Sequence, residues 1–291
     1  MKLQSLIISL LVSLSITSNA LAAKSTSLNW SGCGITKKAF MTELANAYQK
    51  KTGIKINLRG GGATRGIRDV VKKKAHIGGA CRAQMELNSI ERKAQQVPVA
   101  WDALVVIVHP SNPVKEISLL QLRDIYRGKI TNWKQLGGRS APIDLYARTG
   151  KISGVGFTLR ELVFNNLNEA FKAKRFFKST GPLEKAIEEN INAIGSTGIS
   201  SAKRRDIKIL NLEGKEPSYE NIRQGKYLLY RPLYLVIRQF EKDKRITGFK
   251  RFALSKEGQA IIREAGSVPY ADAVKLVMNQ LIERRRAAKI E

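Results

Sequence analysis

The chain has 291 residues, and 43% of them are hydrophobic, a composition that supports a sizeable core and argues against a disordered protein. Its 51 basic and 24 acidic residues give a formal net charge of +27. Such a charge is compatible with binding nucleic acid, collecting anions or resting on an anionic membrane. The basic residues are spread through the chain rather than gathered in one arm, so most of them are expected to form a solvated surface.

The first residues predict export. Met1-Lys2 is followed by an apolar run over residues 6–16 and then by Ala20-Leu21-Ala22, a cleavage site of the small-x-small type. We predict that residues 1–22 are a signal peptide removed after Ala22, which sends the protein to the periplasm. The alternative is a membrane anchor, but the apolar run is shorter than the ~20 residues of a spanning helix. Export argues against nucleic acid as a partner.

Apolar periodicity after residue 22 predicts alternating strands and helices, the pattern of an α/β fold with a parallel sheet. Strands are predicted at residues 27–30, 54–58, 77–80, 97–108, 143–147, 193–194 and 227–237. Helices are predicted at residues 36–51, 67–74, 119–127, 157–166, 183–190, 246–254 and 258–265, with a helical tail ending at residues 284–286.

The strands at 97–108 and 227–237 are the longest apolar stretches of the mature chain, and we interpret them as crossings between two lobes. Lobe I would be discontinuous, built from residues 23–108 and 231–291, and lobe II would be residues 109–230. Two lobes joined by two crossing strands predict a hinged cleft.

Three turns share one design, because residues 31–35, 60–66 and 153–156 each stand before a predicted helix. The start of a helix exposes unpaired backbone N–H groups and the positive end of its dipole, and glycine lets the backbone approach a ligand closely. Three such turns facing one cleft would bind an oxyanion without a catalytic group. Each turn taken alone is also an ordinary α/β connection.

The sequence QLRDIYRGKITNW at residues 121–133 resembles a hallmark stretch of the phosphate-type solute-binding proteins of ABC transporters. Further matching segments follow the order of that family: GGGATRGIR at 60–68, IGGACR at 77–82, AIGSTG at 193–198 and YRPLY at 230–234. The likeness covers nearly the whole mature chain. It implies the type II periplasmic-binding-protein fold, two α/β lobes hinged by two crossing strands.

The resemblance also implies a set of ligand positions, which are Gly34, Ile35, Thr36, Ala63, Thr64, His76, Arg82, Arg148, Ser153, Gly154 and Val155. Three of them, Ile35, Ala63 and Val155, stand where the family has hydroxyl side chains, and His76 stands where it has an Asp. Arg148 is the expected main charge partner, because a planar guanidinium can bind two oxygens of a tetrahedral anion.

Two of these positions have a second interpretation. Arg82 would supply another positive charge to the ligand, or it would pair with an acidic residue at the lobe interface. His76 would make the site favour more fully ionised anions, or it would be an ordinary structural histidine at the start of a strand.

The predicted function is that of an exported, monomeric solute-binding protein that captures phosphate or a related oxyanion and delivers it to an ABC permease. The alternative is a phosphate-binding-like module that acts as a sensor or surface scaffold without transport. We expect no cofactor and no metal, since the chain has two His and two Cys without ligand spacing. An enzyme is not expected, because nucleophile-elbow motifs and metal-spaced His clusters are missing from the sequence.

The two cysteines, Cys33 and Cys81, are expected to form a disulfide. In a sheet of this family both of their turns lie at the carboxyl ends of neighbouring strands, beside the cleft. An oxidising compartment would then join them. The alternative is two separate buried thiols that fill apolar space.

Overall fold

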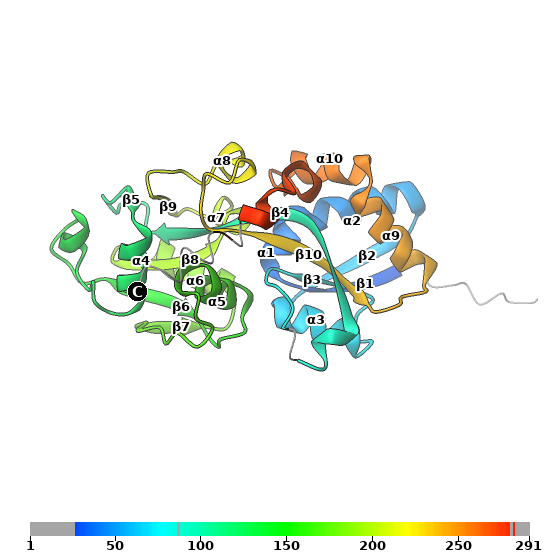
Figure 1. Cartoon of the computed structure of the whole chain (residues 1–291), viewed down its shortest axis with the longest axis horizontal. Helices are drawn as coiled ribbons and strands as arrows, with labels where there is room; N and C mark the ends of the chain where they lie inside the picture. Colours follow the sequence, from blue (N-terminus) through cyan, green and yellow to red (C-terminus); the bar gives the residue numbers. More distant parts are fainter. Residues whose placement is uncertain (1–26, 86–87, 280–281, 283–291) are drawn as a thin grey trace, which may run out of the picture.

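The computed structural model describes residues 27–85, 88–279 and 282, so the predicted signal peptide and the basic tail lie outside the described residues. The protein has two α/β lobes that lie side by side and are joined by long strands (Figure 1). The predicted two-lobed fold is therefore confirmed. None of the helices in the described part of the chain is both long and apolar enough to cross a bilayer.

Lobe I contains a parallel sheet in which β1 (Ser27–Gly32) lies between β2 (Lys55–Gly60) and β3 (Ile77–Ala80). A continuous helix begins with α1 (Gly34–Thr36), passes through a π-helical turn (Lys37–Met41) and ends with α2 (Thr42–Thr52). The other elements of this lobe are α3 (Ala63–Val71), a 3-10 turn (Glu91–Lys93), α9 (Lys244–Leu254), α10 (Lys256–Glu264), β11 (Val268–Pro269) and a 3-10 turn (Tyr270–Ala273).

Lobe II contains β6 (Asp144–Arg148), which pairs in parallel with β7 (Arg175–Phe177) and β8 (Ala193–Gly198). A short second pair is formed by β5 (Glu116–Ile117) and β9 (Lys208–Leu212). The helical elements are α4 (Leu119–Tyr126), a 3-10 turn (Trp133–Leu136), α5 (Gly154–Leu159) with its π-helical extension (Arg160–Phe164), α6 (Thr180–Glu188), α7 (Ile199–Ala202) and α8 (Tyr219–Arg223).

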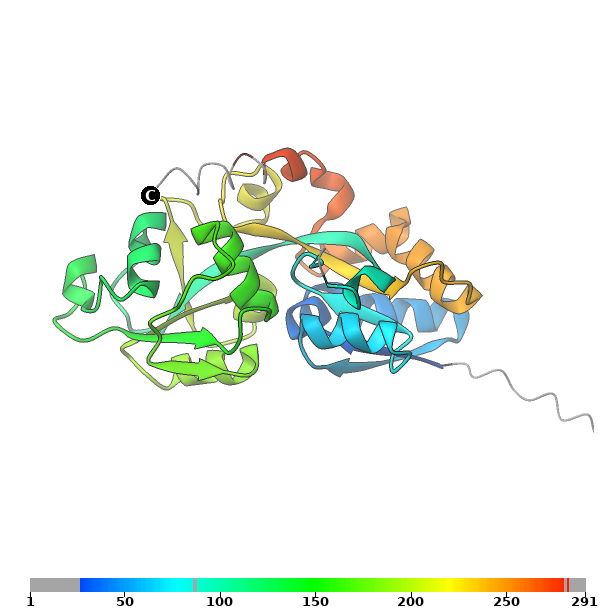
Figure 2. The ribbon, with the colours of Figure 1, turned by 60° about the horizontal axis from the view of Figure 1, so that its bottom comes forward.

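The crossings are β4 (Ala94–Val108) and the segment that leads into β10 (Tyr230–Arg238), two neighbours seen again in Figure 2. β4 pairs with β10 up to Ala103 and with β8 from Leu104 onward. The change of partners at this point puts the first crossing a few residues before the predicted boundary at residue 108. The Leu104 amide donates to the Leu229 carbonyl, which joins the two crossings directly (2.7 Å).

Glycines bring the start of α3 against the sheet. A Cβ on Gly66 would lie 2.7 Å from the Gly79 carbonyl oxygen and 2.8 Å from that of Ser31. Only glycine allows such an approach, so α3 is fixed close to the carboxyl ends of β1 and β3. In parallel sheets that edge is where ligands bind, and here it faces lobe II.

Candidate functional site

A cavity of about 770 Å³ lies between the lobes and is lined from both of them. Its cationic lining residues are Lys38, Arg65, Arg148, Lys178 and Arg205, and its hydroxyl-bearing ones are Thr64, Thr149, Ser153, Ser179, Thr180 and Ser201. Among the described residues, no Asp or Glu lines the cavity. This composition suits an anion. No group of three or more His, Cys, Asp and Glu side chains within residues 27–85 and 88–279 could hold a metal.

On the lobe I side, the cavity is bounded by the glycine turn before α3. Gly62 has φ +89°, a left-handed conformation that glycine adopts without strain, and it is the N-cap of α3. The amides of Gly61 and Gly62 donate to the Gly32 carbonyl at 2.8 and 3.0 Å. These two amides fix the turn, so the amides that remain to face a ligand belong to the first turn of α3.

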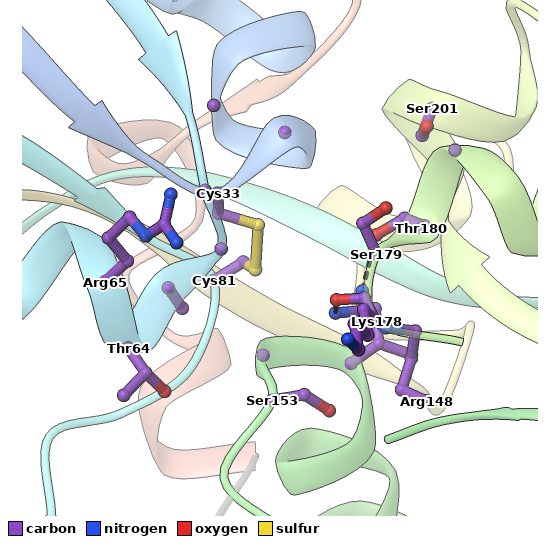
Figure 3. A pocket seen from close by; sticks show the side chains of 18 of the residues that line it. Cys33, Thr64, Arg65, Cys81, Arg148, Ser153, Lys178, Ser179, Thr180 and Ser201 are labelled. Carbon is purple, nitrogen blue, oxygen red and sulfur yellow. Dashed lines mark hydrogen bonds between the residues drawn. A yellow bond between two sulfur atoms is a disulfide. The ribbon is translucent and has the colours of Figure 1, made fainter. Parts of the chain in front are cut away.

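The predicted disulfide is confirmed, since Cys33 and Cys81 are joined with their Cα atoms 6.2 Å apart. Cys33 follows β1 and Cys81 follows β3, and both residues line the cavity (Figure 3). The Cys33 amide also donates to the Gly79 carbonyl at 2.9 Å. The bond therefore links two turns at the edge of lobe I and puts sulfur atoms on the cavity surface.

On the lobe II side, Ser153 is the N-cap of α5, and its hydroxyl accepts a hydrogen bond from the Gly156 amide at 3.2 Å. Gly154 and Val155, in the first turn of that helix, also line the cavity. A Cβ on Gly154 would lie 2.4 Å from the Cys81 sulfur and 3.3 Å from the Ala63 Cβ. The two lobes therefore touch at this point, and glycine is needed for the contact.

Arg148 ends β6 and is buried in the wall of lobe II. Its Nε donates to the Phe177 carbonyl (3.1 Å), and its terminal nitrogens donate to the Lys178 carbonyl (2.7 Å) and the Thr180 hydroxyl (2.9 Å). Burial lowers the pKa of Arg148 to about 10, so the guanidinium is protonated at neutral pH. Arg148 thus supplies charge and also holds the turn between β7 and α6.

That turn was missed by the sequence analysis. Lys178, Ser179, Thr180 and Gly181 all line the cavity, and α6 begins at Thr180 (Figure 3). It repeats the strand, turn and helix arrangement of the three predicted turns. The available signal was Lys-Ser-Thr-Gly just before a predicted helix, but β7 has only three residues, and two of them are exposed.

The other end of the cavity is held together by a buried carboxylate. Lys38 of lobe I donates to the Ser201 hydroxyl at 2.8 Å and lies 3.7 Å from Glu184. Arg205 is 3.4 Å from the same Glu184, whose side chain is fully buried. Glu184 therefore neutralises part of the charge of these two cations, which the sequence analysis did not identify.

A second buried ion pair joins the crossings to both lobes. Asp102 of β4 and Arg231 of β10 are 3.3 Å apart, and Arg231 also donates to the carbonyls of Cys81 (3.0 Å) and Gly154 (3.4 Å). The Ser200 hydroxyl donates to Asp102 at 2.7 Å. Burial raises the pKa of Asp102, an effect that Arg231 opposes. This cluster therefore links both crossing strands to Cys81 of lobe I and to Gly154 and Ser200 of lobe II.

The structure places the predicted ligand residues in two groups. Gly34, Ala63, Thr64, Arg148, Ser153, Gly154 and Val155 line the cavity. Ile35 and Thr36 lie just behind it in the core; Ile35 lies against Gly198 of lobe II, and the Thr36 hydroxyl donates to the Ala80 carbonyl at 3.3 Å.

Arg82 and His76 are also outside the cavity lining. Arg82 forms a fully buried pair with Glu91 at 2.7 Å and reaches lobe II by donating to the Ile152 carbonyl at 3.1 Å, which matches the second interpretation of this residue. His76 precedes β3, and its Nδ1 accepts from the Asn29 amide at 2.9 Å. The cavity is at the opposite, carboxyl end of that strand, so the geometry does not bring His76 to the cavity lining.

Comparison with known proteins places the chain among binding proteins. The family model described as the PBP superfamily domain matches residues 30–257. The phosphate-binding protein PstS of Borreliella burgdorferi is 28% identical over 245 residues, which cover 81% of this chain and 87% of that protein. PstS of Bacillus subtilis is 26% identical, covering 84% of this chain and 81% of the relative.

Solved structures give the same result. A protein of Clostridium perfringens, described as a phosphate ABC transporter substrate-binding protein and solved with bound phosphate, has a TM-score of 0.75 and 29% identity. The match covers 84% of this chain and 99% of that one. An ABC-type phosphate transport receptor of Vibrio cholerae has a TM-score of 0.64 and 27% identity, over 83% and 99% of the two chains. From the family match and this fold, we conclude that the chain belongs to the PBP superfamily.

Proposed function

We propose that this chain is an exported solute-binding protein that captures a small oxyanion, phosphate or a related anion, between its lobes for an ABC transporter. The observation that carries the proposal is the cavity between two lobes of a PBP domain, lined by cations and hydroxyls and, within the described residues, by no carboxylate. Relatives that match along most of their length are named phosphate-binding proteins.

Arg148 is suited to bind an anion directly. It uses one hydrogen on each of its nitrogens for the turn between β7 and α6, and the second hydrogen of each terminal nitrogen remains for a ligand. The Thr180 hydroxyl accepts from Arg148, so its own hydrogen is available to an anion oxygen. Charge-assisted bonds of this kind are stronger than neutral ones.

The proposed role is binding rather than catalysis. The site offers fixed donors and positive charge, and the similar proteins are described as transport or binding proteins rather than enzymes. Those descriptions favour a transport role over a sensor or scaffold. The proposal includes removal of residues 1–22, a location outside the cytoplasm, a monomeric state and an ABC permease as partner.

Calorimetric titration of the mature protein with orthophosphate and sulfate tests the binding role. Saturable binding of either anion, lost when Arg148 is replaced by Gln, is the expected result. An absence of heat with both anions, and with the phosphate esters used below, would contradict the proposal.

Uptake by cells tests the transport role separately. Deleting the gene is expected to lower the uptake of the anion that the protein binds, and export of the wild-type chain should restore it. If uptake is unchanged while the purified protein binds that anion, the sensor or scaffold role is correct and the transport role is wrong.

A further inference from the structure

The cavity is larger than a single tetrahedral anion requires. Its volume of about 770 Å³ is in the range of about 300–1,000 Å³ that protein pockets use for organic ligands. This space is present although the lobes are already in contact through Thr64, whose hydroxyl donates to the Ile152 carbonyl at 2.8 Å, and through the contact of Gly154 with the disulfide. The cavity therefore has this volume while the lobes are in contact at these residues.

Part of the lining is apolar. The disulfide, Ala63, Ile152 and Val155 all border the cavity, and none of them brings a polar side-chain group. Ala63, Cys81 and Gly154 are contiguous, since a Cβ on Gly154 would contact both of the others. Apolar surface forms no hydrogen bonds with an inorganic oxyanion. It does stabilise the carbon body of an organic ligand, its hydrocarbon part, by removing it from water.

Cations line the cavity from both lobes, with Lys38 and Arg65 in lobe I and Arg148, Lys178 and Arg205 in lobe II. Arg148 and Lys178 both come from the ends of strands in lobe II, and within the described residues neither has a carboxylate within ion-pair distance. Lys38 and Arg205, by contrast, share the buried Glu184. The cavity therefore combines positive charge at Arg148 and Lys178 with apolar residues. Figure 3 shows Arg148 and Lys178 across the cavity from the disulfide, with Arg65 on the side of the disulfide.

We infer that the ligand is an organic phosphate, a phosphate monoester or phosphonate, whose phosphoryl group binds at Arg148 and Lys178. Its carbon body lies against the disulfide, Ala63 and Val155. The inference rests on the proposed function, because it names the class of anion that the same cleft captures.

Titration of the mature protein with orthophosphate, pyrophosphate, glycerol 3-phosphate and phenyl phosphate tests the inference. At least one of the two esters should bind at least about tenfold more tightly than both inorganic anions, because only an ester uses the apolar wall. If orthophosphate or pyrophosphate binds as tightly as the better ester, the inference is wrong and the proposed function stands. If neither these phosphate compounds nor sulfate binds, the proposed function itself fails.

Near-isosteric variants test whether Ala63 and Val155 form the surface that favours an ester over orthophosphate. Ala63→Ser with Val155→Thr adds two hydroxyls to the apolar wall and should lower the ratio of ester to orthophosphate affinity by about tenfold. Val274→Thr, at a position that is 55% exposed and outside the cavity lining, is the matched control and should leave the ratio unchanged. Ala63→Ser alone makes a smaller change in the core and should shift the ratio in the same direction. An unchanged ratio in folded Ala63→Ser and in the double variant would overturn the assignment of the wall.

Discussion

The two walls of the cleft are held in different ways. In lobe I the turns after β1 and β3 are joined by the covalent Cys33–Cys81 bond, and the glycine turn before α3 is fixed by backbone bonds to Gly32. In lobe II the wall is fixed by side chains, chiefly Arg148, which donates to two backbone carbonyls and one hydroxyl of the turn beside it.

This difference decides what a substitution in each wall should change. The turns of lobe I are fixed by a covalent bond and by backbone hydrogen bonds, so breaking the disulfide should act mainly on stability. In the proposed function, Arg148 of the lobe II wall both supports the turn beside it and binds the ligand, so a substitution there should act on stability and on affinity. A ligand binds better to donors that are already fixed, and each wall achieves this by its own means.

Replacing Arg148 with Gln should have the largest effect. Truncating one partner of a buried charge-assisted contact costs about 2–5 kcal/mol, which corresponds to a loss of affinity of about 30-fold or more. Calorimetry on the ligand that binds most tightly measures this loss. Arg148→Lys keeps a charge but lacks the planar guanidinium with five donors, so it cannot support the turn and bind the ligand in the same way and should recover only part of the affinity. Wild-type affinity in Arg148→Gln would show that the site is placed wrongly.

Replacing both cysteines with serine should lower the free energy of unfolding by about 4 kcal/mol, the chain-entropy value for a separation of 48 residues. Denaturant unfolding of the oxidised protein and of the variant measures the difference. Reduced wild-type protein is the matched control and should behave like the variant. Equal midpoints for the oxidised protein and the variant would contradict the structural role of the bond.

Replacing Lys178 with Gln should weaken binding by a few-fold, since an exposed charge contributes up to about 1 kcal/mol. The matched control is Arg175→Gln, which removes an exposed charge three residues earlier, in β7, at a position outside the cavity lining. Equal effects of the two substitutions would mean that Lys178 acts through the general field of the protein and not through contact with the ligand.

The smallest expected effect is on the stability of the protein in acid, through Asp243 on the far side of lobe I. Hydrogen bonds from Arg245 lower the pKa of Asp243 to about 2, and the Asp243 side chain is also the N-cap of α9. Because the folded-state pKa is depressed, the stabilisation is present above pH ~4 and is lost as the pH falls toward 2. In Asp243→Asn, the free energy of unfolding should therefore change less as the pH falls through this range. If the free energy of unfolding depends on pH in the variant as it does in the wild type, other carboxylates cause the acid sensitivity.

Much of the fold could be predicted from the sequence because it depends on local periodicity. The strand predicted at 97–108 is β4 (Ala94–Val108), and the helix predicted at 119–127 is α4 (Leu119–Tyr126), which begins with a capping box at Ser118. The short elements β5, β7 and β11 were not predicted. Each has only two or three residues, too few to show a period.

The site was harder to predict because it depends on which end of a strand a residue occupies. His76 and Cys81 flank the same strand, β3, yet only Cys81 lies at the carboxyl end that faces lobe II. Arg82 is one residue further on, but its charge is taken up by Glu91, nine residues later, in a segment without a recognisable pattern. Lys38 and Arg205 reach the cavity only through the packing of one lobe on the other.

The most direct test of the account is a crystal structure of the mature protein grown with the phosphate compound that binds most tightly. A tetrahedral density between the lobes, within hydrogen-bond distance of Arg148 and Thr180, is the predicted result. A cleft that contains only water under these saturating conditions, or a phosphoryl group bound on another surface, would contradict the account.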